Sequence, residues 1–318
     1  MKLIAIRASD FDLAMTLNSG QVFHWEKAGR GFVGAIGDLP LWVGQRDDVI
    51  NVSRSSRPVR LNRTSLSDIV SNYFALDHPL AEICASFPDD PVMREARDFC
   101  RGLRIIRQPK WECLATFICS SMKQVAHIRQ ISRKLRERFG QQREIVNYSV
   151  FTFPTAKRLA ASSERELRKC GLGYRAINLL KTARLVASGE VDPEKMSILS
   201  DADLRARLCE LPGVGAKVAN CVMLFGYERL RAFPIDVWIE RMLRQKYFPR
   251  ARKLKAARLR TFTESYFGKH GGYAQQYLFH HARTIGRARR ARRGAPGGRA
   301  LPKLTLSAAS GCDKVRTL

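Results

Sequence analysis

The chain has 318 residues, a formal net charge of +27 and 45% hydrophobic residues. This composition excludes an intrinsically disordered chain, and no stretch reaches the roughly 18 apolar residues that a membrane-spanning helix needs. The basic excess is not confined to the end of the chain, because residues 287–318 carry nine Lys and Arg and one acid, which leaves +19 for residues 1–286. We therefore expect a folded protein whose partner is a polyanion.

The first 76 residues have the pattern of short β-strands. Apolar residues alternate with other residues in segments 21–25, 31–36 and 41–43, and Gly, Asn and Asp separate these segments. We expect a small antiparallel sheet domain over residues 1–76.

From about residue 66 onward the apolar spacing becomes helical. Between Trp111 and Leu135 apolar residues recur at steps of three and four. After residue 286 come arginines and then a Gly, Pro, Ala and Ser stretch without apolar periodicity. The sequence therefore predicts an α+β fold, with a mostly helical region over 77–286 and a disordered basic tail over 287–318.

The eight cysteines form no Cys-x-x-Cys pair and no compact zinc or iron–sulfur spacing. The apolar run at the N-terminus is too short for a signal peptide. We therefore expect free thiols, no metal, and a reducing intracellular compartment.

The most informative segment is LPGVGAKVA, residues 211–219. It follows a helix that Ser200 can cap, so residues from about 200 to 227 are expected to form a helix, a glycine hairpin and a second helix. Glycines let the hairpin turn tightly, and the free N–H groups that open the second helix can then hold a phosphate of DNA. The residues expected at this phosphate are Gly213, Val214 and Gly215.

Lys217 lies in the first turn of the second helix, where the positive end of the helix dipole favours a neutral, nucleophilic amine. A solvated lysine that only contacts phosphate is the alternative. Asp236 follows an apolar lead at the start of another helix, where it is an obvious N-cap. A carboxylate fixed among apolar residues can also stabilise a developing cation, so Lys217 and Asp236 form the candidate catalytic pair.

These residues resemble the helix-hairpin-helix DNA glycosylase superfamily, in which a catalytic aspartate follows a Gly/Pro-rich hairpin. Members with a lysine at the position of Lys217 are bifunctional glycosylase/lyases, whereas the alkyladenine type lacks it. The endonuclease III and adenine glycosylase branches usually carry a four-cysteine iron–sulfur loop after the aspartate. Here only Cys312 follows Asp236, which disfavours those branches.

Three further segments narrow the resemblance to the 8-oxoguanine DNA glycosylase. Residues 18–25 (NSGQVFHW) are similar to that family's Ser-Gly-Gln-x-Phe-x-Trp signature. Residues 117–121 (FICSS) are similar to its Phe-Ile-Cys-Ser-Ser segment, and residues 171–176 (GLGYRA) to its Gly-Leu-Gly-Tyr-Arg-Ala loop. They occur in the family's order, so the resemblance implies that the helical region is the glycosylase region.

The resemblance also implies a base pocket. Gly20 would offer its carbonyl to the N7 hydrogen that 8-oxoguanine has and guanine lacks. Cys221 and Phe279 would sandwich the flipped base, and Gln275 would bind its pairing edge. The spacing agrees, because Lys217 and Cys221, like Gln275 and Phe279, are four residues apart and share a helix face. Without the family, Gly20 would be a hairpin turn, and Cys221 and Phe279 would be core residues.

The resemblance implies that Tyr174 wedges into the base stack and that Arg175 hydrogen-bonds the orphaned opposite base. A packed Tyr beside a surface Arg is the alternative. The chain departs from the eukaryotic pattern at residues 122–124, where an Asn-rich run normally begins, and at His127, where Arg is expected. Both places concern the opposite base, so we expect a weaker preference for cytosine. Trp238 stands where those relatives have His, so no role of that His carries over.

The sequence thus predicts a base-excision repair enzyme that removes 8-oxoguanine from duplex DNA through a Schiff base on Lys217 and β-elimination. We expect a monomer that needs no metal or organic cofactor and binds no membrane. We expect it inside the cell with the DNA, in the cytoplasm or nucleoid of a prokaryote or the nucleus of a eukaryote. One alternative is a glycosylase/lyase for another oxidised purine, against which Gly20 discriminates. The other is a non-catalytic helix-hairpin-helix DNA-binding module, which leaves the Lys217 and Asp236 pair unexplained.

Overall fold

The computed structural model describes residues 3–54, 64–121, 123–145, 147–251 and 253–293. The chain divides into a compact unit, residues 1–283, and a second unit, residues 284–318. Helix α14 (Gly271–Arg293) extends into the segment that the sequence predicts as a disordered tail. The rest of that prediction, residues 294–318, lies outside the described residues.

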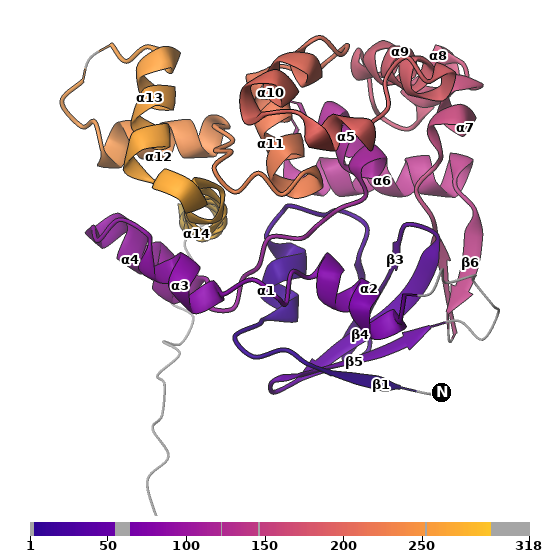
Figure 1. The fold of residues 1–318 in the computed structure, drawn as a ribbon, viewed down its shortest axis with the longest axis horizontal. Coiled ribbons are helices and arrows are strands. Elements are labelled where there is room, and N and C mark those ends of the chain that lie inside the picture. Colours follow the sequence, from indigo (N-terminus) through magenta and orange to yellow (C-terminus); the bar gives the residue numbers. More distant parts are fainter. Residues whose placement is uncertain (1–2, 55–63, 122, 146, 252, 294–318) are drawn as a thin grey trace, which may run out of the picture. The chain divides into compact units, whose positions relative to one another are not determined.

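The N-terminal part of the compact unit contains an antiparallel sheet of five strands in the order β1-β5-β4-β3-β2 (Figure 1). The strands are β1 (Ile4–Arg7), β2 (Glu26–Ala28), β3 (Gly31–Ile36), β4 (Leu39–Arg46) and β5 (Val49–Arg54). Strands β2 to β5 pair in sequence order, whereas β1 returns to pair with β5, with Ile4 opposite Val52. The predicted strands at 31–36 and 41–43 are confirmed.

Two helices cover one face of this sheet, α1 (Leu13–Asn18) and α2 (Leu66–Tyr73). Alternate strand residues point to the same face, so Leu41 and Val43 of β4 both enter the core between sheet and helices. There they pack with Leu17 and Val70, and none of the four side chains is more than 2% exposed.

The predicted strand over residues 21–25 is wrong, because this segment is irregular. It lies between two cores and is covered on both sides. Trp25 packs into the sheet core, whereas Phe23 packs into the core of the helices. Gln21 is fully buried and accepts a hydrogen bond from the Ile106 N–H (2.7 Å), so its side chain ties the segment to a distant part of the chain.

A second sheet consists of only two strands, β6 (Gln142–Ile145) and β7 (Tyr148–Phe151). It packs against the first sheet, where Ile145 and Val150 contact Val33 and neighbouring apolar side chains. The sequence does not predict this hairpin, because strands of four residues with exposed polar side chains give no clear apolar alternation.

Helices make up the other described elements and confirm the α+β class. The α-helices not yet named are α3 (Leu80–Ala85), α4 (Pro91–Phe99), α5 (Lys110–Ser120), α6 (Val125–Phe139), α7 (Ala156–Ala160), α8 (Glu164–Lys169), α9 (Arg175–Ser188), α10 (Asp201–Cys209), α11 (Ala216–Gly226), α12 (Val237–Lys246) and α13 (Ala256–Tyr266). Two short 3₁₀ helices, η1 (Lys195–Ile198) and η2 (Gly268–His270), join them. Helix α5 is buried from Glu112 to Ser120 and contacts α6, α9 and α11, so it is the centre of this region (Figure 1).

A buried ion pair fixes α5 against α6. The Arg136 guanidinium donates a hydrogen bond to the Glu112 carboxylate and another to the Phe151 carbonyl (3.0 Å). Burial raises the pKa of Glu112, and the charge of Arg136 opposes that rise. Because removing one member would leave a buried charge unpaired, the pair holds α5 rigidly in place.

Candidate active site

The glycine hairpin joins α10 to α11, as predicted. Ser200 caps α10 by accepting a hydrogen bond from the Asp203 N–H (3.2 Å). Gly213 has a φ of +83°, in the left-handed region that favours glycine. Gly215 has an ordinary φ of −98°, so the turn does not require glycine there. It is the N-cap of α11 and no side chain of the described residues caps that helix, so the N–H groups that open α11 can bind a phosphate.

Lys217 is the second residue of α11, and its amine is held by α5. The Lys217 Nζ donates a hydrogen bond to Ser120 Oγ (3.3 Å) and lies 5.3 Å from the centre of the Phe117 ring. Ser120 Oγ donates its own hydrogen to the Phe117 carbonyl (2.7 Å), so a lone pair of the hydroxyl faces the amine. The rigid helix α5 therefore positions the candidate nucleophile.

Cys221 lies one turn beyond Lys217 on α11 and is buried. Burial raises the pKa of the Cys221 thiol, the charge of Lys217 opposes that rise, and the charge of Asp236 adds to it. Helix α11 therefore carries Lys217 and Cys221 one turn apart, and the charge of Asp236 acts on the same thiol.

Asp236 is the N-cap of α12, because its Oδ1 accepts a hydrogen bond from the Ile239 N–H (2.8 Å). Burial raises the pKa of its carboxyl above the usual aspartate value. The Ile239 N–H and the charges of Lys217 and Arg283 oppose that rise. The cap and the proposed chemical role are compatible, since the carboxylate that closes the helix is also subject to the charge of Lys217.

In the turn after α1, one backbone carbonyl has no hydrogen-bond donor among the described residues. Carbonyls 18, 19 and 21 each accept a hydrogen bond from a side chain. In chain order these bonds are Arg283 Nη2 to Asn18 O (2.6 Å), Gln276 Nε2 to Ser19 O (3.2 Å) and Gln108 Nε2 to Gln21 O (2.8 Å). Within the described ranges nothing donates to the carbonyl of Gly20. It is therefore the carbonyl of this turn that a ligand can use.

Helix α14 places Gln275 and Phe279 beside this turn. Gly20 has a φ of +92°, and a Cβ there would lie 3.1 Å from Phe279 Cε1 and 2.7 Å from Arg283 Nη1. Gln275 is 4% exposed, and its buried Oε1 has no hydrogen-bond donor among the described residues. A buried acceptor without a donor is costly unless a ligand satisfies it, which fits a side chain that binds the edge of a base.

Sequence reasoning missed two residues of this site, Ser120 and Arg283. Ser120 belongs to the FICSS segment, but its side chain carries no sequence signal for contact with Lys217. Arg283 is 7% exposed and stacks over the Phe279 ring at 5.2 Å. Its position one turn after Phe279 is the one signal that could have placed it at the pocket.

Tyr174 and Arg175 lie at the start of α9. Tyr174 is 55% exposed, and the Arg175 guanidinium lies 4.3 Å from the centre of its ring. Arg175 itself is buried and donates to the carbonyls of Ser121 (2.7 Å) and Leu172 (3.2 Å). The exposure of the Tyr174 ring fits the predicted wedge, whereas Arg175 must exchange these bonds before it can reach a base.

His127 is exposed in the first turn of α6. Lys123 and Gln124 are also exposed just before that helix, and Met122 lies outside the described residues. The contacts of these residues with an opposite base stay a prediction.

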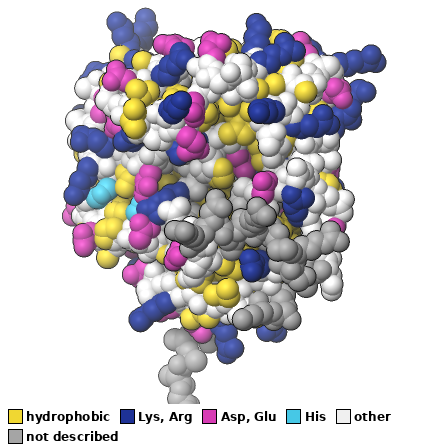
Figure 2. All heavy atoms as spheres, turned by 45° about the vertical axis from the view of Figure 1, so that its right-hand side comes forward, with side chains coloured by type: hydrophobic (Ala, Val, Ile, Leu, Met, Phe, Trp, Pro, Cys, Tyr) yellow, Lys and Arg dark blue, Asp and Glu magenta, His cyan; other side chains and the backbone are white. Residues whose placement is uncertain are grey.

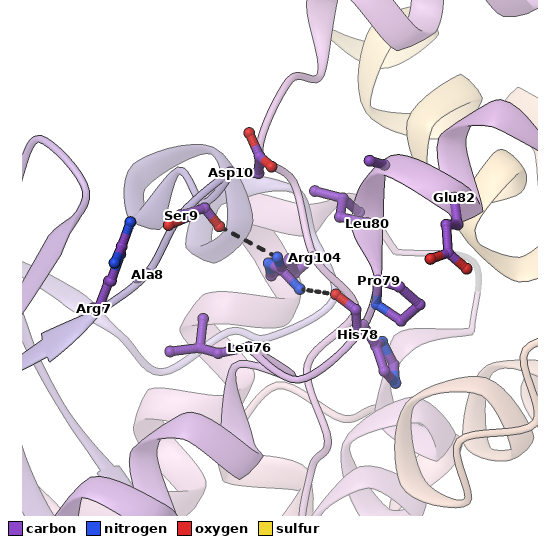
Figure 3. A pocket seen from close by; sticks show the side chains of 11 residues that line it. Arg7, Ala8, Ser9, Asp10, Leu76, His78, Pro79, Leu80, Glu82 and Arg104 are labelled. Carbon is purple, nitrogen blue, oxygen red and sulfur yellow. Dashed lines mark hydrogen bonds between the residues drawn. The ribbon is translucent and has the colours of Figure 1, made fainter.

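A cavity of about 470 Å³ lies away from this cluster, and none of the predicted site residues lines it (Figure 3). Its wall includes the buried Arg104, whose guanidinium donates to the carbonyls of Ser9 (3.3 Å), Ala75 (2.7 Å) and His78 (2.9 Å). This arginine therefore joins three backbone segments and serves the fold.

The described residues lack what a metal site or a membrane-spanning helix needs. No described His, Cys, Asp or Glu residues gather in threes that could hold a metal ion, and the described cysteines are free thiols. None of the described helices combines the length and apolarity needed to cross a membrane. Lys and Arg side chains are spread over the face shown in Figure 2, with Asp and Glu scattered among them.

Known proteins match nearly the whole described unit. The family model for the N-terminal domain of 8-oxoguanine DNA glycosylase matches residues 3–114, and the model for the HhH-GPD superfamily base excision DNA repair protein matches residues 115–266. The chain is 31% identical over 286 residues to N-glycosylase/DNA lyase OGG1 of Arabidopsis thaliana, covering 85% of this chain and 77% of that protein. It is 29% identical over 313 residues to the probable N-glycosylase/DNA lyase of Methanothermobacter thermautotrophicus, covering 91% and 99%.

A solved structure agrees with these matches. The 8-oxoguanine glycosylase/lyase of Clostridium acetobutylicum, in complex with double-stranded DNA containing cytosine opposite to 8-oxoG, has a TM-score of 0.81 at 27% identity. The match covers 89% of this chain and 98% of that one. The chain therefore belongs to the 8-oxoguanine DNA glycosylase family, the bifunctional N-glycosylase/DNA lyases of base-excision repair.

Proposed function

We propose that this enzyme excises 8-oxoguanine with Lys217 as the nucleophile and Asp236 as the stabilising carboxylate. The observation that carries the proposal is the position of the Lys217 amine, which Ser120 holds near the uncapped start of α11. The buried Cys221 thiol lies one turn further along the same helix, and the charge of Lys217 acts on the Asp236 carboxylate that caps α12. An amine and a carboxylate held at a DNA-binding hairpin supply the two groups that base excision with strand cleavage needs.

The chemistry begins when the neutral Lys217 amine attacks C1′ of the sugar. The bond from C1′ to the base breaks, its electron pair leaves with the base, and Asp236 stabilises the cationic character at the sugar. The amine passes one proton to the released base, and the C1′–O4′ bond then breaks as O4′ takes a proton from solvent, which leaves a protonated Schiff base on the open sugar. Loss of a C2′ proton then expels the 3′ phosphate by β-elimination, which nicks the strand on the 3′ side. No step requires a metal or an organic cofactor.

Base recognition relies on the Gly20 carbonyl, which accepts the N7 hydrogen of 8-oxoguanine. Guanine has a lone pair at N7, which the carbonyl repels. Phe279 supplies one wall of the pocket and Cys221 the other, and the buried Gln275 Oε1 gains a donor from the pairing edge of the base. Flipping a base costs a few kcal/mol, which the Tyr174 wedge and the hairpin contacts with phosphate offset.

Duplex DNA carrying 8-oxoguanine is the proposed partner, as double-stranded DNA is in the complex of the Clostridium acetobutylicum relative. The net charge of +27 supports binding to a polyanion. We propose that the enzyme acts as a monomer inside the cell, in the compartment that contains the DNA. The sheet domain, residues 1–76, supplies Gly20, and the helical region, residues 77–286, supplies the chemistry.

Borohydride trapping tests the mechanism. Reduction during turnover on an 8-oxoguanine duplex should fix a covalent adduct between enzyme and DNA, because borohydride reduces a Schiff base to a stable amine. An enzyme that nicks the duplex but gives no adduct under these conditions would rule out the lysine mechanism.

We predict a weak preference for cytosine opposite the lesion. The imidazole of the exposed His127 has fewer donors than the fixed fork of a guanidinium. The loss of one charge-assisted hydrogen bond removes at most about 1.5–3 kcal/mol of recognition. Arg175 should keep some preference, and His127→Arg should raise the preference for cytosine by up to roughly 10- to 150-fold.

The measurement is the single-turnover rate on 8-oxoguanine paired with C, T, G and A, for the wild type and His127→Arg. Lys123→Arg, at an exposed position just before the same helix, controls for added guanidinium charge. A wild type that acts only on the cytosine pair, with no change in His127→Arg, would place the discrimination in other residues.

A further inference from the structure

Arg283 is a buried cation beside the proposed base pocket, and the proposed chemistry gives it no role. Arg283 follows Phe279 by one turn of α14, is 7% exposed, and stacks on the Phe279 ring at 5.2 Å. Burying a guanidinium is costly, so its contacts must be specific.

The contacts of Arg283 converge on the turn that precedes the pocket. Arg283 Nη2 donates to the Asn18 carbonyl at 2.6 Å and lies 3.2 Å from His280 Nδ1. Burial and the charge of Arg283 lower the pKa of His280 to about 4, so this imidazole is neutral at physiological pH and its Nδ1 can accept the bond. The guanidinium therefore has a fixed position between the turn, the ring of Phe279 and His280.

The turn that Arg283 binds is the one that carries Gly20. Arg283 Nη2 holds the carbonyl of Asn18, Gln276 holds that of Ser19, and the Gly20 carbonyl follows directly. A Cβ placed on Gly20 would lie only 2.7 Å from Arg283 Nη1. The guanidinium therefore packs against the backbone of Gly20 itself. Glycine in the left-handed region is conformationally free, and neighbouring bonds must fix the direction of its carbonyl.

We propose that Arg283 is a positioning residue that sets the discrimination between 8-oxoguanine and guanine by fixing the direction of the Gly20 carbonyl. The inference rests on the proposed role of Gly20. A fixed carbonyl binds the N7 hydrogen of 8-oxoguanine and repels the N7 lone pair of guanine. A carbonyl free to rotate turns away from guanine, so both the gain for the lesion and the penalty for the normal base shrink.

The test compares Arg283→Ala, Arg283→Lys and the wild type. The measured quantities are the ratio of affinities for 8-oxoguanine and guanine duplexes, the single-turnover excision rate with its pH profile, the lyase rate on a duplex with a preformed abasic site, and Tm. Arg283→Ala should lower the affinity ratio by roughly 10-fold or more, the size expected for one charge-assisted hydrogen bond. Excision should fall at least ten times more than lyase action, because an abasic site has no base to recognise.

Arg283→Lys should recover part of the ratio, since an ammonium can still donate to the Asn18 carbonyl. His281→Ala is the matched control, because His281 lies on the same helix and its ring contacts Phe99 at 5.3 Å.

Three results would overturn the inference. The first is an unchanged affinity ratio in Arg283→Ala. The second is an equal fall in excision and lyase rates that follows a fall in Tm. The third is a shift in the acid limb of the pH profile of excision while the affinity ratio stays unchanged. That result would show that Arg283 acts on the carboxyl of Asp236 instead. A wild type without preference for 8-oxoguanine over guanine would overturn both the inference and the role of Gly20.

Discussion

Replacing Lys217 by Gln should reduce both base excision and strand cleavage by roughly 10³-fold or more, the order of loss expected when a covalent nucleophile is removed. In the proposed mechanism both activities depend on the same amine, which forms the bond to C1′ and then the Schiff base. Lesion binding should persist, because the hairpin N–H groups belong to the backbone and the Gly20 carbonyl lies in another part of the chain.

The measurement combines single-turnover rates, borohydride trapping and the dissociation constant for an 8-oxoguanine duplex. Lys195→Gln is the control, because Lys195 is an exposed lysine whose amine lies 3.8 Å from Asp192 and far along the chain from the hairpin. Normal base release by Lys217→Gln would show that another group attacks the sugar.

Replacing Asp236 by Asn should slow excision by roughly 10²–10³-fold, the range found when one stabilising group of a transition state is removed. The amide can still cap α12 by accepting from the Ile239 N–H, so Tm should change little. Affinity for the lesion should also change little, because the carboxylate acts on a charge that develops only during the reaction.

The pH dependence separates the two roles of Asp236. Burial raises its pKa in the folded chain, so excision by the wild type should be lost on acidification at a pH above the usual aspartate value of about 4. Asp236→Asn should lack this acid limb. The raised pKa also means that the ionised carboxylate lowers the free energy of unfolding at neutral pH and that acidification removes this penalty. A fall in rate that matches a large fall in Tm would favour the cap as its main role.

Local patterns are enough to place the proposed catalytic residues on their helices. Lys217 and Cys221 are four residues apart on one helix, and Asp236 has the form of an N-cap, so sequence spacing is enough to place them. The glycine hairpin is equally local, although only Gly213 needs the conformation that glycine allows.

The recognition half depends on contacts between distant segments. Nothing in the spacing of residues 18–21 indicates that Arg283 and Gln276 bind their carbonyls. The strand predicted at 21–25 is wrong for the same reason, because contacts with two separate cores determine which of these side chains are buried. The local sequence does not reveal those contacts. Only the resemblance to a family, and then the fold, connected Gly20 to Phe279.

The bond from Arg283 to Asn18 spans 265 residues, so the pocket closes only when both ends of the folded unit are present. During synthesis the ribosome releases Lys217 and Asp236 well before the helix that carries Phe279 and Arg283. A nascent or truncated chain that stops before α14 therefore possesses its nucleophile but has no means of choosing a base. Base recognition therefore depends on contact between the two ends of the folded unit, whereas the proposed attack on the sugar depends on residues from its middle.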